Sequence, residues 1–330
     1  GLWSATTTWV GGVVPDGGDN ATIVDGAAVT IDMNPTVGNL TVGGGTSGIL
    51  EYSTTTARTL AVGGTVLVNT GATFRSTTGT VTTHVLSAAG NITNNGTLDF
   101  STNINTAGAG ITFTGAADQL ISGTGATTDL FSLTMSKSAL ANLVDFNLSN
   151  FTVKGASTSV TTTILTTGSG TGTIKFSGSN SFSGTLWSTA SYTIASTLGL
   201  WINNPNFTVQ GLLGSPTVSG LLRVTQGIYN VGTATGNEMS GGGQFIFEGG
   251  TINFTGRFNV TTGTATYNQS GGTLNITTIG STSTTIPPFR FTGNTFTMSG
   301  GTIILVLKGG STGADYNVTP TTVNITGGTL

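Results

Sequence analysis

Gly250-Thr251-Ile252-Asn253-Phe254 is one copy of a short phrase that recurs through the last third of the chain. Further copies begin at Gly227, Gly272, Gly301 and Gly328. In the full copies, the second and fourth residues after the glycine are apolar, whereas the first and third are mostly Thr or Asn. Alternation with a period of two predicts strands that bury one face and expose the other.

A second alternating strand precedes each of these glycines, and successive glycines lie 22 to 29 residues apart. Repeats of this length without a helical period are typical of solenoids. We therefore predict an all-β fold, a single-stranded parallel β-helix of roughly 13 coils with an N-terminal aromatic cap. Right-handed winding is expected from the general preference of parallel crossover connections.

The recurring glycines are expected to form the corners of the coils. Glycine adopts the positive φ that other residues resist, and the corners of stacked coils approach one another closely. One copy places Gln269 in the last inward-facing position before its glycine. Because a buried amide needs hydrogen-bond partners, we expect either a stacked amide ladder or a local shift of register there.

The first two thirds of the chain follow the same pattern less regularly. Asn95-Gly96-Thr97-Leu98-Asp99-Phe100 matches it and predicts Leu98 and Phe100 as inward-facing residues. Residues 129–154 are richer in large apolar side chains, and a short helix over 139–143 competes there with continued coils. We favour continued coils.

The composition excludes several classes of protein. Only 6% of the 330 residues are charged, the net charge is −3, and no basic cluster could neutralise a run of phosphates, so we expect no nucleic-acid partner. Cysteine is absent, which excludes disulfides and thiolate metal sites. The aliphatic run 303–307 is far shorter than the roughly 20 residues of a membrane-spanning helix, so we expect no membrane insertion.

An open end of a β-helix exposes apolar side chains and unpaired backbone groups, so a cap is needed at the start. Trp3 and Trp9 are suited to cover the first coil. In the alternative interpretation these tryptophans form a platform on which sugar rings stack, but we favour the cap. We therefore divide the chain into a cap with the first coil over residues 1–35 and a parallel β-helix over residues 36–330.

The opening residues resemble those of a known family. Trp3, Thr8–Pro15, Asp19–Ile23 and Gly26–Asp32 are similar to the start of large secreted cell-surface β-helix proteins of Bacteroidetes-type bacteria. Such proteins begin with an aromatic cap and usually end in a type IX secretion sorting domain. The resemblance implies an adhesin-like protein at the extracellular bacterial cell surface, and it implies no enzyme. Leu330 lies inside a repeat phrase, so we expect the β-helix to continue beyond residue 330.

Residues that could carry chemistry are sparse. His84 is the single histidine, no carboxylate lies near it in the sequence, and we predict an outward-facing surface residue rather than a catalytic base. Asp16, Asp19, Asp25 and Asp32 form the densest acidic group. Calcium would accept such oxygens, but Pro15-Asp16-Gly17-Gly18-Asp19-Asn20 is better explained as a turn, and calcium binding by Asp16 and Asp19 stays open. We predict no catalytic, cofactor-binding or metal-binding residue and no cofactor.

Two functional hypotheses follow. The first is an exported structural or adhesive surface protein, a β-helical stalk or filament segment that attaches to surfaces or glycans without turning them over. The alternative is a carbohydrate-active enzyme, a polysaccharide lyase or glycoside hydrolase, which requires acids such as Asp99, Asp118 or Asp129 to converge in one cleft. A third expectation is self-association of the chain through its coil ends.

Overall fold

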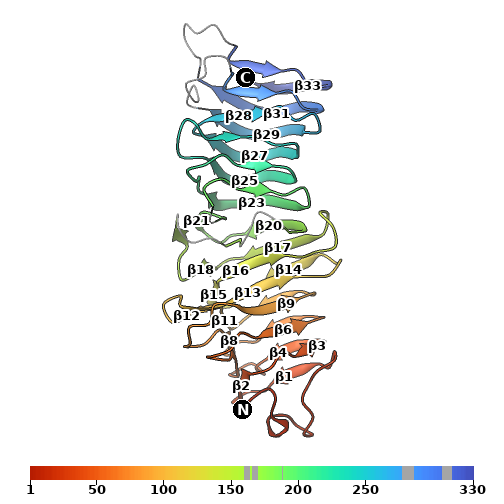
Figure 1. Ribbon diagram of the computed structural model, residues 1–330, viewed down its shortest axis with the longest axis vertical. Helices are drawn as coiled ribbons and strands as arrows, with labels where there is room; N and C mark the ends of the chain where they lie inside the picture. Colours follow the sequence, from red (N-terminus) through yellow and green to blue (C-terminus); the bar gives the residue numbers. More distant parts are fainter. Residues whose placement is uncertain (160–163, 166–169, 188, 277–285, 307–313) are drawn as a thin grey trace. The chain divides into compact units, whose positions relative to one another are not determined.

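The computed structural model describes residues 1–159, 164–165, 170–187, 189–276, 286–306 and 314–330. The chain divides into two compact units, the first built mainly from Gly1–Ser157 and the second mainly from Phe182–Leu330. In both units, strands of successive coils lie side by side (Figure 1).

Each coil of the first unit contributes short strands to three parallel sheets. The first sheet contains β1 (Ala21–Ile23), β4 (Leu40–Val42), β7 (Val66–Val68), β10 (Ile92–Asn94), β14 (Gln119–Ser122) and β17 (Leu143–Leu148). The second contains β2 (Ala28–Ile31), β5 (Ile49–Tyr52), β8 (Thr73–Arg75), β11 (Thr97–Asp99), β15 (Thr127–Leu130) and β18 (Thr152–Val153). The third contains β3 (Thr36–Val37), β6 (Thr59–Val62), β9 (His84–Ala88), β13 (Ala107–Phe113) and β16 (Ser132–Met135), with β12 (Ser101–Thr102) antiparallel to β13.

The second unit uses longer strands that bend around a corner. Its main sheet contains β20 (Gly172–Gly178), β23 (Leu198–Val209), β25 (Leu221–Val231), β27 (Gln244–Phe254), β29 (Thr266–Ile276), β31 (Thr295–Leu305) and β33 (Thr322–Thr329), with β19 (Thr158–Ser159) and β21 (Phe182–Gly184) beside it. Shorter strands complete the coils: β22 (Thr193–Ile194), β24 (Thr217–Val218), β26 (Glu238–Met239), β28 (Arg257–Val260), β30 (Phe289–Phe291) and β32 (Tyr316–Val318).

The corners form as the sequence predicts. Gly227, Gly250, Gly272, Gly301 and Gly328 all have φ between +65° and +98°. A Cβ added to Gly272 would lie 2.5 Å from the carbonyl oxygen of Gly249 in the coil next to it. The corner glycines are therefore required both for their backbone conformation and for the close approach of stacked coils.

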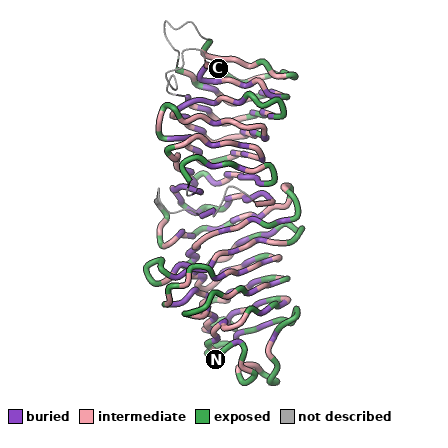
Figure 2. Tube along the Cα trace, in the orientation of Figure 1, coloured by how far each residue is buried: buried purple, intermediate pink, exposed green. Residues whose placement is uncertain are grey.

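Alternation of buried and exposed residues runs along the coils (Figure 2). Leu98 and Phe100 are fully buried, as predicted. Aromatic rings stack between coils in the second unit; the centroids of Tyr267 and Phe296 lie 4.5 Å apart with the rings nearly parallel. Bends and a turn over residues 138–141 lead into β17, so continued coils rather than a helix occupy that segment.

The all-β parallel solenoid is confirmed, with a correction to the number of coils. The structure has about 11 turns rather than roughly 13, in part because the first strand begins at Ala21 and residues 1–20 contribute no coil. The described residues contain one 3-10 helix, Thr6–Thr8, and no helix that is apolar and long enough to cross a membrane. The handedness stays a prediction.

The N-terminal cap is built around Trp3. Its side chain is fully buried, and its backbone N–H donates to the carbonyl of Thr30 on β2 at 2.8 Å. The indole N–H of Trp9 donates to the carbonyl of Trp3 at 2.7 Å, and the two rings meet edge to face at 4.8 Å. Trp3 is inaccessible to a sugar ring. The alternative interpretation, a sugar-stacking platform, is therefore wrong for Trp3.

Candidate functional site

The most chemically suggestive group in the first unit is a row of charged residues on its second sheet. Glu51, Arg75, Asp99 and Asp129 are register partners on β5, β8, β11 and β15. Arg75 forms an ion pair with Glu51 at 2.8 Å. The residues lie 24 to 30 positions apart in the sequence, and stacking of the coils brings them together.

Asp99 and Asp129 are adjacent carboxylates in this row. Burial raises the pKa of Asp99, and the negative charge of Asp129 raises it further, against a hydrogen bond from the Ser101 backbone and the charge of Arg75. Burial also raises the pKa of Asp129. Paired carboxylates with raised pKa values are the groups that acid–base catalysis uses.

The same carboxylates are nevertheless bound to the scaffold. Asp129 accepts hydrogen bonds from the hydroxyl of Thr152 at 2.7 Å and from the backbone N–H of Gly155 at 2.9 Å. Asp118 lies away from this row, ahead of β14, where it accepts the N–H of Leu143 at 2.7 Å. Two of the three acids named for the enzyme hypothesis therefore share a row, and the third does not join them.

The four N-terminal aspartates hold turns and neighbouring coils together. The Asp19 N–H donates to the Asp16 carbonyl at 3.2 Å, which confirms a turn at these residues. The carboxylate of Asp25 accepts backbone N–H groups across the coil, with Gly44 at 2.7 Å, and these hydrogen bonds lower its pKa to about 2. Asp32 accepts the backbone N–H of Ser4 at 2.9 Å. Among the described residues, no group of three or more His, Cys, Asp or Glu could hold a metal ion.

The prediction of an exposed His84 is wrong. His84 is buried at the start of β9, where its ring stacks on Tyr52 with centroids 4.7 Å apart. Its Nδ1 accepts the backbone N–H of Arg58 at 3.0 Å. Burial lowers the pKa of His84, and the nearby charge of Arg58 lowers it further. The alternation along β9 could have indicated this burial, because His84 is two residues from Leu86 and four from Ala88 and therefore lies on the same inward-facing side of the strand.

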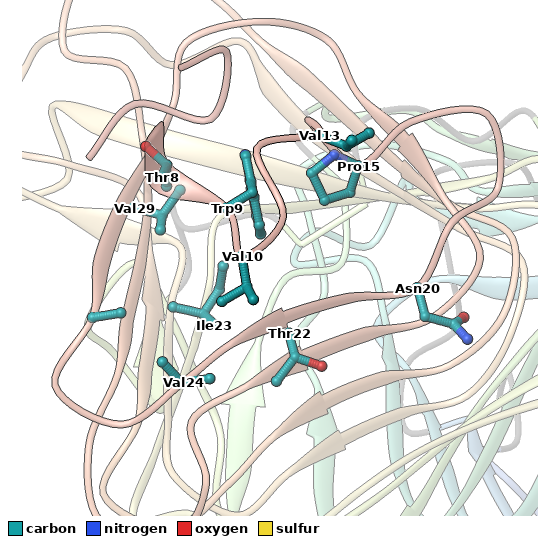
Figure 3. A pocket seen from close by; sticks show the side chains of 11 residues that line it. Thr8, Trp9, Val10, Val13, Pro15, Asn20, Thr22, Ile23, Val24 and Val29 are labelled. Atoms are coloured by element: carbon teal, nitrogen blue, oxygen red, sulfur yellow. The ribbon is translucent and has the colours of Figure 1, made fainter. Parts of the chain in front are cut away.

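A cavity of about 310 Å³ lies beneath the capping loop of the first unit (Figure 3). Its lining combines the Trp9 ring with branched aliphatic side chains such as Val10 and Val24, and no charged residue takes part. Among its polar lining residues, Thr8 donates its hydroxyl to the Leu2 carbonyl, and the amide of Asn20 points away from Trp9 in Figure 3. The pocket is open to solvent, because Val10 and Val24 are exposed, and its Thr8 and Asn20 side chains form hydrogen bonds within the scaffold, Asn20 as acceptor from Asn39.

A second cluster lies on the first half of the main sheet of the second unit. The Trp201 ring has the ammonium of Lys175 4.6 Å from its centroid and the guanidinium of Arg223 at 3.7 Å. Arg223 makes two hydrogen bonds of 2.9 Å to the carboxylate of Glu248. The Trp201 indole N–H donates to the hydroxyl of Thr225 at 2.8 Å. The pairing of Arg223 with Glu248 joins two neighbouring coils at this cluster.

The second half of that sheet carries uncharged polar rows. Thr251, Thr273 and Thr302 are register partners in one row, and Asn253 and Asn275 are partners in another, two residues further along each strand. Side-chain hydrogen bonds connect the amides of successive coils; Asn253 donates to Asn230 at 2.8 Å. The sequence predicts these residues as outward-facing positions, and the adhesive hypothesis expects outward rows of Thr, Asn and Ser to contact surfaces and glycans.

Gln269 is fully buried, but its partners differ from a stacked ladder. Its Oε1 accepts the hydroxyl of Tyr267 at 2.6 Å, and its Nε2 donates to the carbonyl of Gly271 at 3.3 Å. The pairing of β27 with β29 also shifts register just after this residue. The predicted register shift is therefore present, and the corner backbone satisfies the buried amide.

Comparisons of the chain with protein-family models, with curated proteins and with solved structures found no match. The fold and the side-chain geometry are thus the basis for any functional proposal.

Proposed function

We propose that this chain is part of an exported structural or adhesive protein of the bacterial cell surface, a β-helical stalk or filament segment that attaches to surfaces or glycans. The observation that carries the proposal is the repetition of outward hydroxyl and amide side chains from coil to coil in the second unit, exemplified by Thr273 and Asn275. Such rows give many equivalent, weak hydrogen-bonding positions along one face. Many weak contacts made together can give strong overall attachment.

The use of the charged groups supports the same proposal. Asp16, Asp25, Asp32 and Asp118 each accept a backbone N–H from a residue about one coil away. Glu51, Glu238 and Glu248 pair with arginines. These carboxylates therefore stabilise the stacking of coils, while the rows of Thr273 and Asn275 are uncharged, so salt should screen contacts made by these rows little.

Export to the cell surface and passage through type IX secretion are the finer part of the proposal. Their support is the resemblance of the opening residues, Trp3 and Thr8–Pro15 above all, to secreted surface proteins. Detection of the protein on intact cells, and its loss from the surface when that secretion system is deleted, would test this part.

One observation favours a second candidate function, a carbohydrate-active enzyme. Asp99 and Asp129 are stacked carboxylates with raised pKa values, as an acid–base pair would be. They lie on the neighbouring strands β11 and β15 of the second sheet, and their hydrogen bonds with Ser101, Thr152 and Gly155 hold them to the backbone and to a neighbouring coil.

Incubation with neutral and acidic polysaccharides separates the two candidates. For the adhesive protein we expect sedimentation with at least one insoluble polysaccharide and no release of reducing ends or unsaturated products. Release of products by the wild type that disappears in both Asp99→Asn and Asp129→Asn would establish the enzyme instead. The variant Asp118→Asn is the matched control, because Asp118 lies outside the row.

A further inference from the structure

We propose that a ladder of amide side chains in the second unit is the binding track for an extended, uncharged polysaccharide. The amide ladder consists of Gln210, Asn230, Asn253 and Asn275, and it begins at the hydroxyl of Ser183. The inference rests on the proposed adhesive function and names the surface and the chemistry of its ligand.

The hydrogen bonds of the amide ladder all run in one direction. Gln210 donates to Ser183 at 2.7 Å, and Asn230 donates to Gln210 at 3.4 Å. Asn253 then donates to Asn230 at 2.8 Å, and Asn275 donates to Asn253 at 2.9 Å. Each amide is thereby held in one orientation before any ligand arrives, which reduces the entropy lost on binding.

The ladder leaves half of each amide available. A primary amide has two N–H donors and a carbonyl with two lone pairs, whereas each internal rung donates one N–H and accepts one hydrogen bond. The side chains of Asn230, Asn253 and Asn275 are partly exposed on the outward face of their strands. The track therefore presents a donor and an acceptor once in every coil.

The spacing between the rungs and the charge of the surrounding surface indicate which polysaccharide would fit the ladder. Strands of successive coils are about 4.8 Å apart, close to the length of one pyranose residue in an extended β-(1→4)-linked chain. A polysaccharide lying across the strands could thus place one sugar over each rung. The hydroxyls of Thr251 and Thr273 flank the ladder, and neither row contains a charged residue among those described, so a neutral chain fits better than a uronic acid polymer.

The ladder ends at a defined position. Ile304 is the register partner of Asn275 on the next strand, and about half of its side chain is exposed (49%). An asparagine there would add one rung with the same geometry. The chain thus offers a variant that should improve binding as well as variants that should weaken it.

The test measures the affinity of the whole 330-residue chain for cellohexaose by calorimetry, with hexagalacturonate as the charged comparison. Asn253→Thr removes an internal rung and should weaken cellohexaose binding by roughly fivefold to tenfold, the effect of one or two lost hydrogen bonds. Asn268→Thr is the matched control, because Asn268 is an outward residue on the other half of β29. Ile304→Asn should strengthen binding by a few-fold.

The outcomes separate this inference from the proposed function. Binding of cellohexaose that is weakened by Asn253→Thr, strengthened by Ile304→Asn and unaffected by Asn268→Thr supports the amide ladder. Equal affinities in all variants would overturn the ladder and leave an adhesive protein with another binding face. Failure of the wild type to bind cellohexaose, while it sediments with other polysaccharides, also overturns the ladder alone. No binding to any polysaccharide would remove the basis for both.

Discussion

The two units build similar coils by different means. In the first unit a coil consists of separate short strands, and side chains such as Asp25 and Asp118 tie each turn to a neighbouring coil. In the second unit a single strand of 11 residues bends through a glycine with positive φ, as at Gly250 and Gly272. Glycines with positive φ, such as Gly43 and Gly71, also lie at turns of the first unit, so its corners combine backbone conformation with side-chain hydrogen bonds.

One ion pair of the second unit is far more buried than the pair of the first unit, whereas its Arg223–Glu248 pair is similarly exposed (29% and 32%). The Arg75 and Glu51 side chains of the first unit are 40% and 26% exposed. In the second unit the Arg257 side chain is fully buried against Glu238, which is 21% exposed. A surface pair contributes little because water solvates both partners, whereas a buried charge depends on its partner.

The largest expected effect is therefore the removal of Arg257. Arg257→Ala opens a large space in the core and removes the cation beside the partly exposed Glu238, so we expect a loss of about 3–5 kcal/mol in the free energy of unfolding. Arg75→Ala in the first unit should cost less than about 1 kcal/mol. Urea unfolding followed by hydrogen exchange, which locates the loosened unit, provides the measurement.

Replacement of Arg257 by Met distinguishes the effect of the lost positive charge on stability from the effect of the lost side-chain volume. A buried pair can often be replaced by an apolar residue of similar size with little loss. We expect Arg257→Met to recover part of the stability lost in Arg257→Ala. Equal losses in Arg257→Ala and Arg75→Ala would contradict the difference drawn between the two units.

The next effect in size tests the glycine corners. At Gly272 an alanine would have to adopt a φ of +70° and place its Cβ 2.5 Å from the Gly249 carbonyl oxygen. We expect Gly272→Ala to destabilise the second unit by about 2–4 kcal/mol, the sum of backbone strain and overpacking. Gly263→Ala is the control, because nothing lies within 4 Å of its added Cβ. A similar loss in both variants would mean that corner geometry is not the cause.

Much of this fold could be predicted because its pattern is local. Strict alternation identified buried residues such as Leu98 and Phe100, and the recurring glycines identified the corners. The third strand of each coil was missed in the second unit because strands such as β26 (Glu238–Met239) are too short to show alternation. Two residues do not establish a period.

The candidate sites were harder to predict because they depend on register between coils. Arg75, Asp99 and Asp129 form one row, but the intervals between them vary with turn length, so no fixed spacing reveals them. His84 was misassigned because its Thr-rich flank, Thr82-Thr83, suggested an exposed strand. The spacing of two residues between His84 and Leu86 was the better signal of burial, since every second residue of a strand lies on the same face.

A smaller effect is expected from acidification of the first unit, through His84. Burial lowers the pKa of His84, so the unfolded chain binds the proton more readily than the folded chain does. The free energy of unfolding should therefore fall as the pH drops below about 6.5, until the folded-state pKa is passed. Protonation of Nδ1 would also break the hydrogen bond from the Arg58 backbone and place a cation beside the Arg58 side chain.

His84→Gln removes this titration and should flatten the stability profile of the first unit between about pH 7 and pH 5. Asp99 and Asp129 act in the opposite direction, because their raised pKa values favour the folded state at low pH. The profile should therefore be measured in the Asp99→Asn background as well. An unchanged slope in His84→Gln would show that His84 does not titrate on unfolding.

The smallest effect concerns a single turn of the first unit, held by Asp25. Hydrogen bonds from the backbone N–H groups of Gly44 and Ser47 lower its pKa from 3.8 to about 2, so its contribution to stability is present above pH 3.8 and is lost as the pH falls towards 2. Asp25→Asn keeps an acceptor but removes the charge, and we expect faster hydrogen exchange at Gly44 and Ser47 near neutral pH. The Asp19 carboxylate accepts one long hydrogen bond of 3.5 Å. Asp19→Asn should therefore leave the hydrogen-exchange rates of the Gly44 and Ser47 amides unchanged. If Asp25→Asn left their exchange unaltered, the turn would be fixed by its own backbone, as the corners of the second unit are.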